Sequence, residues 1–304
     1  MREKSLTKQL YEQRYLLLLS VPFVVWLAVF KYIPLAGWMM AFQDFKPHLG
    51  ILNQTWVGLK HFRDLFHAPM FYQALQNTLG MSFLGLVFGF VTSIGFALLL
   101  NELRFLPFKR FIQTVSYLPH FVSWVVTANI VSSMLSVSGP VNDLFVALGV
   151  VSTPINFMGK PEYFWFLVTL ADVWKEMGWS AIIYLAAMTG IDRQVYEAAA
   201  IDGVNRLQRV WYVTLPGISS TIIILMILSI GNIINIGFEK QMLLGNAVTA
   251  TKALVLDKYA LDFGIGLFRY SYGTAIGIFK SVVSIGLLFL ANYLAKRAGK
   301  GRLF

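Results

Sequence analysis

Ionisable and aromatic side chains are grouped within one apolar segment in the middle of the chain. Asp172, Lys175, Glu176 and Trp179 lie within 164–190, which holds no other charged residue. At about 100° per residue, these four positions fall on one stripe of a helix. Two carboxylates, an ammonium and an indole on one face suit either contact with a polar ligand in a cavity or an internal ion pair facing a partner helix. Both interpretations stay open at the level of the sequence.

A second polar stripe is predicted on the segment 217–239. Asn232, Asn235 and Glu239 share one helical face there. Asn offers both a donor and an acceptor, which suits a hydroxyl-rich ligand, although Asn also joins neighbouring helices by hydrogen bonds. Lys280 lies inside a further apolar segment, where an unpaired ammonium is costly. The candidate ligand-pathway residues are therefore Asp172, Lys175, Glu176, Trp179, Asn232, Asn235, Glu239 and Lys280.

The remaining polar and small residues carry less specific signals. Lys31 and Lys240 are expected near the outer interface, where a lysine reaches water along its apolar stem. Pro119-His120 is expected to kink a helix. The small-residue spacings Gly85–Gly89 and Gly273–Gly277 predict close helix packing.

Several kinds of chemistry find no support in the residues. The chain has no cysteine, which excludes disulfides, thiolate metal sites and cysteine nucleophiles. His48, His61, His67 and His120 show no metal-ligand spacing. Neither a serine nucleophile elbow nor a zinc-protease motif occurs, and no phosphate-binding loop with Lys-Ser/Thr is present. We therefore expect a chain without catalytic residues, metal or cofactor of its own.

The elements that position these residues are apolar and long. Of the 304 residues, 57% are hydrophobic and 13% charged, whereas soluble domains carry about a quarter charged residues. The apolar residues form runs long enough to cross a bilayer as helices. We expect one all-α integral membrane domain, 1–304, with a loop at 191–216 between spans four and five. The six predicted spans are 15–39, 73–101, 111–137, 164–190, 217–239 and 272–295.

Lysine and arginine predict the orientation of the chain. Most lysines and arginines lie in the two termini and in the short connections 102–110 and 191–216. The other connections are longer and hold fewer. By the positive-inside rule, both termini are predicted to be cytoplasmic. The same rule explains the net charge of +10, and no basic domain or aromatic-basic module indicates nucleic-acid binding.

The 191–216 loop has the signals of a short, stiff helix. Asp192 is a suitable N-cap for a helix through Ala200. Gly203 permits a turn with positive φ, and Pro216 fits the first turn of the next span. The small side chains at 198–200 let another surface approach the helix closely.

In this loop the sequence resembles a known family, the permeases of binding-protein-dependent ATP-binding-cassette importers. Their signature loop has Glu-Ala-Ala, a Gly, a β-branched residue and Leu-Pro at fixed spacing. The chain has all of these elements in register, at Glu197, Ala198, Ala199, Gly203, Val213, Leu215 and Pro216. Further segments resemble the carbohydrate branch, and its polysaccharide and oligosaccharide permeases in particular; these are 30–34, 56–62, 76–78, 98–102 and 237–240.

The resemblance implies a bacterial inner-membrane subunit that works by alternating access. Its partners would be a second homologous permease, two ATPase subunits that bind ATP and magnesium, an extracytoplasmic solute-binding protein and the surrounding lipid. The contact with the ATPase is expected at Glu197, Ala198, Ala199, Asp202 and Gly203. The cargo is expected to be an oligosaccharide, and we predict an acidic one, such as fragments of alginate or aldouronates.

Two other functions remain as alternatives. An ion-coupled secondary sugar transporter would show internal repeats and interrupted helices, and neither is evident in the sequence. A membrane assembly or sensor protein would not need the full spaced pattern of the 191–216 loop.

Overall fold

The computed structural model describes residues 12–297 and 299. Within these residues the chain is mostly helical, and the strands β1 (Gln43–Asp44) and β2 (Thr55–Trp56) form one short antiparallel pair. The described chain falls into two compact units. The first unit comprises the part up to His67 together with Phe263–Ile278, and the second comprises Ala68–Asp262 and the part from Phe279 onward.

The first unit begins with a helical segment of 29 residues, Arg14–Phe42. Its parts are α2 (Arg14–Leu27), the π-helical η1 (Ala28–Tyr32) and the 3₁₀-helical η2 (Ile33–Phe42). No residue of α2 is buried, and a helix that is apolar all round is typical of a membrane span. The β1–β2 pair, η3 (Ile51–Asn53) and α3 (Lys60–His67) follow.

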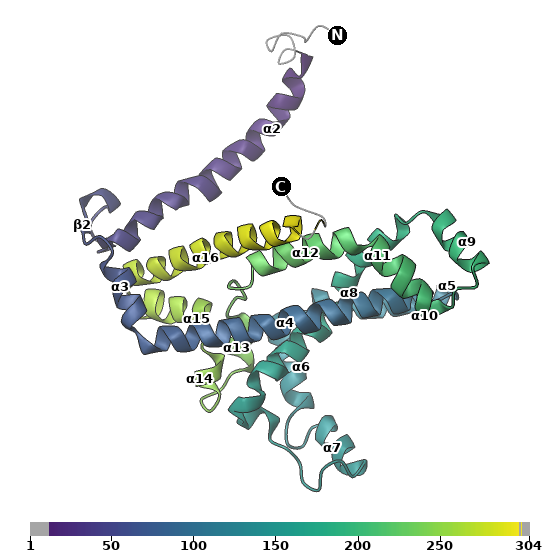
Figure 1. The fold of residues 1–304 in the computed structure, drawn as a ribbon. Coiled ribbons are helices and arrows are strands. Elements are labelled where there is room, and N and C mark those ends of the chain that lie inside the picture. Colours follow the sequence, from purple (N-terminus) through teal and green to yellow (C-terminus); the bar gives the residue numbers. More distant parts are fainter. Residues whose placement is uncertain (1–11, 298, 300–304) are drawn as a thin grey trace. The chain divides into compact units, whose positions relative to one another are not determined.

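The second unit is built around two long helices that lie side by side, α4 (Pro69–Glu102) and α8 (Phe164–Thr189) (Figure 1). Two apolar clusters hold them together. One contains Met81, Phe164 and Val168, and the other contains Ala97, Ala181 and Tyr184. The indole of Trp165 lies against Gly80, where a Cβ would collide with the ring.

Shorter elements complete the fold. After α4 come α5 (Leu106–Phe121), α6 (Trp124–Met134), α7 (Pro140–Ala147), η4 (Phe157–Gly159) and η5 (Pro161–Tyr163). After α8 come α9 (Arg193–Ile201), α10 (Arg206–Arg209), η6 (Val210–Thr214), α11 (Leu215–Gly217), α12 (Ser219–Gly231), α13 (Glu239–Leu244), α14 (Ala250–Ala253), α15 (Leu256–Ala260) and η7 (Leu261–Gly266). The long helix α16 (Tyr270–Arg297) ends the described helical structure.

By length and composition, three helical segments of the described chain suit a membrane span: Arg14–Phe42, Pro69–Glu102 and Tyr270–Arg297. The pair 206–217 and 219–231, bent by 62°, is a fourth if it is counted as one span. The 26 residues of α8 reach about 39 Å, which is also long enough, although three ionisable residues make it less apolar. The predicted count of six therefore stays a prediction.

The segments predicted as spans three and five each contain a break in the helix, the first of them close to the expected kink at Pro119-His120. Helix α5 ends at Phe121, Val122 is extended, and Ser123 caps α6 by accepting a hydrogen bond from the Val126 N–H. Pro119 cannot donate a backbone hydrogen bond, and Ser123 favours a new helix start. Interrupted helices, which we did not expect from the sequence, are thus present.

The second interruption separates α12 from α13. Helix α12 ends at Gly231, and the segment 232–238 is not helical. Gly237 has φ +73°, a conformation outside the helical region that glycine adopts without strain. The segment predicted as one span through residue 239 therefore changes direction before α13.

Candidate functional site

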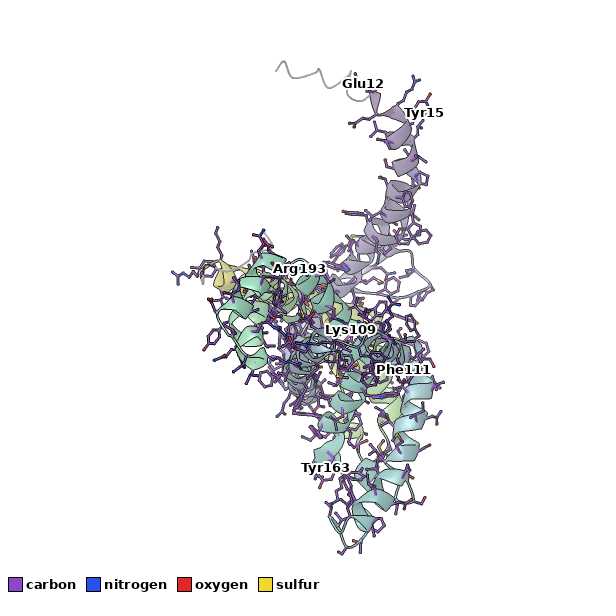
Figure 2. All side chains as sticks on the ribbon, turned by 90° about the vertical axis from the view of Figure 1, so that its right-hand side faces the viewer. Glu12, Tyr15, Lys109, Phe111, Tyr163 and Arg193 are labelled. Atoms are coloured by element: carbon purple, nitrogen blue, oxygen red, sulfur yellow. The ribbon has the colours of Figure 1, made fainter. Side chains whose placement is uncertain are left out.

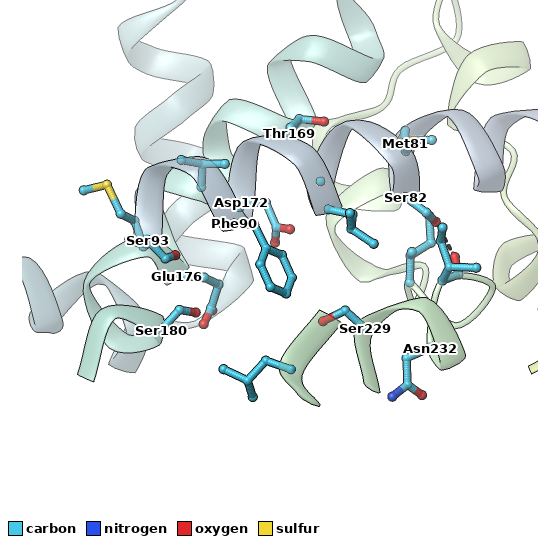
Figure 3. A pocket seen from close by; sticks show the side chains of 18 of the residues that line it. Met81, Ser82, Phe90, Ser93, Thr169, Asp172, Glu176, Ser180, Ser229 and Asn232 are labelled. Carbon is cyan, nitrogen blue, oxygen red and sulfur yellow. Dashed lines mark hydrogen bonds between the residues drawn. The ribbon is translucent and has the colours of Figure 1, made fainter. Parts of the chain in front are cut away.

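A cavity of about 380 Å³ lies between α4, α8 and α12. Its lining includes Met81 of one apolar cluster and Tyr184 of the other, so the cavity borders both clusters. Figure 3 shows the side chains of Asp172 and Glu176, which α8 contributes, and those of Ser229 in α12 and Asn232, which directly follows α12. The polar and charged residues that line the cavity are Ser82, Ser93, Thr169, Asp172, Glu176, Ser180, Ser229, Asn232 and Lys240.

The cation that lines the cavity is Lys240, at the start of α13. Its Nζ lies 2.9 Å from Oδ2 of Asp172 and 5.7 Å from the ring centre of Trp124. Lys240 was expected to reach water near the outer interface; its position relative to the membrane stays a prediction, whereas its ammonium is paired with a carboxylate of α8. The interruption before α13 turns this residue toward α8, and a helical projection from span five does not capture such a turn.

Glu176 contacts two residues besides lining the cavity. Its Oε2 lies 2.7 Å from Nδ1 of His120, and its Oε1 lies 3.5 Å from Nζ of Lys175. The His120 ring stacks on Trp179, with ring centres 4.4 Å apart and an interplanar angle of 1°. His120 is therefore part of the site, which sequence reasoning missed because Pro119 next to it indicated only a kink.

Lys175 is buried and holds the end of α5. Its Nζ donates hydrogen bonds to the carbonyl oxygens of Pro119 at 3.3 Å and His120 at 2.5 Å. A cation at a helix C-terminus satisfies free carbonyls and is favoured by the helix dipole. The predicted stripe thus divides: Asp172 and Glu176 line the cavity, whereas Lys175 and Trp179 pack around the α5–α6 interruption.

The predicted stripe of Asn232, Asn235 and Glu239 is wrong, because the helix ends at Gly231. Asn232 lines the cavity. Asn235 donates to Oγ of Ser284 at 2.7 Å, and Glu239 is an exposed residue in the first turn of α13. The last two residues do not line the cavity.

Lys280 is nearly buried and lies outside the cavity lining. Its Nζ forms an ion pair with Oδ1 of Asp257 in α15. The other oxygen of Asp257 accepts a hydrogen bond from the Gly237 N–H at 3.1 Å. The ion pair therefore fixes the non-helical segment that follows α12, and this role had no signal in the sequence.

The 191–216 loop has the local structure expected for it. Asp192 accepts a hydrogen bond from the Gln194 N–H at 2.9 Å and caps α9. Gly203 has φ +72°. Glu197, Ala198, Asp202 and Gly203 are exposed, whereas Ala199 is buried.

One side-chain contact joins this loop to α4, and another joins two parts of the loop to each other. Arg209 of α10 lies 2.5 Å from Oε2 of Glu102, at the end of α4. The hydroxyl groups of Tyr196 and Thr214 lie 3.1 Å apart and join α9 to η6. The loop follows the C-terminal end of α8, and Tyr163 precedes the N-terminal end of α8. Figure 2 labels both Tyr163 and, in the loop, Arg193. The cavity residues of α8 lie between these two ends.

None of these arrangements resembles a metal centre. Within the described residues, His, Asp and Glu form no group of three or more poised to hold a metal ion. The carboxylates of the cavity are instead paired with Lys240, His120 and Lys175. The site therefore suits binding through hydrogen bonds and ion pairs.

Comparisons with known proteins agree on one family. Residues 85–300 match the family described as binding-protein-dependent transport system inner membrane component. The chain is 44% identical over 304 residues to the polygalacturonan/rhamnogalacturonan transport system permease protein YteP of Bacillus subtilis, covering 100% of this chain and 94% of YteP. It is 42% identical over 296 residues to protein LplB of the same organism, covering 97% and 92% of the two chains.

Solved structures show the same likeness. A chain of a bacterial ABC transporter involved in the import of the acidic polysaccharide alginate matches with a TM-score of 0.87 and 36% identity, covering 97% of this chain and 99% of that one. A chain of a bacterial alginate ABC transporter in complex with an alginate pentasaccharide-bound periplasmic protein also matches with a TM-score of 0.87, at 35% identity and over 99% and 100% of the two chains.

Proposed function

The chain belongs to the family of binding-protein-dependent transport system inner membrane components, and on that premise we propose that it imports acidic oligosaccharides derived from plant or algal polysaccharides. It is a permease subunit of a carbohydrate ABC importer and works with a solute-binding protein; ATP is hydrolysed on a separate chain. Family membership decides against the ion-coupled transporter and the assembly or sensor protein. The helix interruptions described above therefore do not favour the ion-coupled transporter.

The coupling role rests on one observation, the 191–216 loop. It presents a capped, exposed helix between α8 and α11, with the spaced Glu197-Ala198-Ala199 and Gly203 pattern. In this proposal, Glu197, Ala198, Ala199, Asp202 and Gly203 contact a cleft of the ATPase. Movement of that contact would reach α4 through the Arg209–Glu102 ion pair. A second permease chain and two ATPase subunits complete the proposed assembly, with both termini of this chain in the cytoplasm.

The cavity between α4, α8 and α12 supports the second part of the proposal, the pathway of the cargo. Its polar lining of hydroxyl, amide and carboxylate groups suits the hydroxyl groups of a sugar. Asp172, Glu176, Asn232 and Lys240 are the residues proposed to border the cargo. Lys175, Trp179, Asn235, Glu239 and Lys280 lie outside the lining and are proposed to hold its walls in place.

The acidic character of the cargo rests on the relatives. YteP is described as a transporter of polygalacturonan and rhamnogalacturonan, and the structural neighbours belong to an importer of alginate. Lys175 and Lys280 do not add support, because each is already paired with oxygen atoms of this chain. Lys240 is the cavity cation that an anionic sugar could share with Asp172.

Uptake by the reconstituted complex tests the cargo. Galacturonate oligomers are compared with carboxyl-reduced oligomers of equal length, each supplied with the solute-binding protein. We expect at least tenfold faster uptake of the acidic oligomers. Equal uptake of the reduced oligomers would contradict the proposal of an acidic cargo and leave the permease assignment intact.

A further inference from the structure

Two glycines of α4 form part of the cavity wall without being needed for packing. Gly85 and Gly89 line the cavity, and a Cβ added at either position meets no atom within 4 Å. Gly80 of the same helix differs, because a Cβ there would collide with Trp165. The close helix packing predicted from the Gly85–Gly89 spacing is therefore absent within the described chain. The missing side chains leave open space in the cavity instead.

Hydroxyl groups without a partner face the same space. Ser93 is 3% exposed and lines the cavity, one helical turn beyond Gly89. Ser82 of the same helix donates to the carbonyl of Thr78, as hydroxyls in helices commonly do. The hydroxyl of Ser93 makes no hydrogen bond with any part of the chain that the structure describes, and neither do the hydroxyls of Ser180 and Ser229 on the facing helices. Buried hydroxyls usually have partners, so the buried Ser93 indicates a ligand with hydroxyl groups of its own, and the half-buried Ser180 and Ser229 face the same space.

We propose that Gly85 and Gly89 set the width of the cavity and thereby determine which saccharides the permease accepts. Sugar hydroxyls that pass along the surface formed by these two glycines make hydrogen bonds with Ser93, Ser180 and Ser229. The inference rests on the proposed function, because it places the cargo in this cavity. It adds that the missing side chains at Gly85 and Gly89 of α4, and not a charged group, limit how bulky a saccharide the cavity accepts.

A matched set of leucine substitutions tests the proposal. Gly85→Leu and Gly89→Leu fill the cavity from the α4 side, whereas Gly95→Leu is the control. Gly95 also has open space around its Cα and lies in the same helix, but it does not line the cavity and points about 120° away from Gly89. Leu favours a helix over Gly equally at all three positions.

The readout is the uptake of a galacturonate pentasaccharide by the reconstituted complex, after assembly has been checked by co-purification. We expect at least tenfold slower uptake with Gly85→Leu and Gly89→Leu, an intermediate rate with Gly89→Ala, and a rate near wild type with Gly95→Leu.

Cysteine protection gives a second readout that does not depend on the leucine variants. The chain has no native cysteine, so Gly89→Cys and Gly95→Cys each supply a single thiol. The pentasaccharide is expected to slow modification of the thiol at position 89 by a small methanethiosulfonate, and to leave position 95 unaffected.

Equal uptake by Gly89→Leu and Gly95→Leu, without protection at position 89, would overturn the inference while the permease function stands. Loss of assembly with Gly89→Leu together with an unprotected thiol would also overturn it, because the glycines would then serve subunit packing. A wild-type complex that imports no saccharide would instead contradict the proposed function itself.

Discussion

The buried lysines of this chain each have an oxygen partner within the fold. Lys175 donates to the carbonyls that end α5, and Lys280 pairs with Asp257. A buried ammonium is stable only with such compensation. Both ammonium groups are therefore already compensated within the fold.

Removing the Lys175 ammonium should destabilise the α5–α6 interruption. Lys175→Met leaves the carbonyls of Pro119 and His120 without this donor, at a cost of about 1–3 kcal/mol for each buried group left unsatisfied. Lys252→Met is the control, because both lysines lie over an indole ring: Lys175 over Trp124 at 5.9 Å and Lys252 over Trp165 at 5.0 Å. We expect a lower Tm of the detergent-purified complex for Lys175→Met than for Lys252→Met. Equal Tm values would show that Lys175 does not hold the helix end.

Gly203 offers a second prediction for a single residue. With φ +72°, Gly203→Val should strain the loop by about 1–3 kcal/mol and abolish ATPase stimulation by cargo. Gly203→Asn should retain much of it, because Asn tolerates this conformation. Gly149→Val is the matched control, since Gly149 has φ +68° and open space around it but lies in a different loop. ATPase stimulation of normal size with Gly203→Val would contradict the role of the turn.

At the scale of whole elements, the sequence predicted those features that depend on interactions between neighbouring residues. The cap at Asp192, the turn at Gly203 and the length of α8 follow from neighbouring residues. Hydrophobic periodicity could not predict the interruptions at 122–123 and 232–238, because both lie within apolar runs where helix and non-helix look alike. Residues of 232–239 were therefore projected onto one helical face that does not exist, which is why the predicted stripe with Asn235 and Glu239 failed.

An ion pair joins the 191–216 loop to α4, and this contact leads to a prediction about coupling. Arg209 and Glu102 lie 2.5 Å apart and are partly buried, so removing one partner leaves the other uncompensated. Arg209→Glu and Glu102→Arg should each lower transport per ATP hydrolysed, by about tenfold for 1.4 kcal/mol of lost coupling. The double exchange should restore a large part of it. If the double variant is no better than the single ones, the contact does not transmit the movement.

For the whole molecule, the orientation of the chain is a prediction from its lysine and arginine distribution. The absence of native cysteine gives a clean background for labelling from outside. Arg206→Cys in the 191–216 loop should be protected from an impermeant maleimide in intact cells, whereas Asn53→Cys in the first connection should react; both native residues are exposed. Reaction of the thiol at position 206 from outside would invert the orientation and remove the coupling role of the loop.

The central claim is that this permease moves an oligosaccharide with energy from a separate ATPase, and uptake into proteoliposomes tests it most directly. Vesicles hold ATP and the complete complex, and the galacturonate pentasaccharide is supplied outside with the solute-binding protein. We predict uptake with the active ATPase, and none with an ATPase variant that cannot hydrolyse ATP. Uptake that persists with the disabled ATPase and follows an imposed ion gradient would contradict the claim.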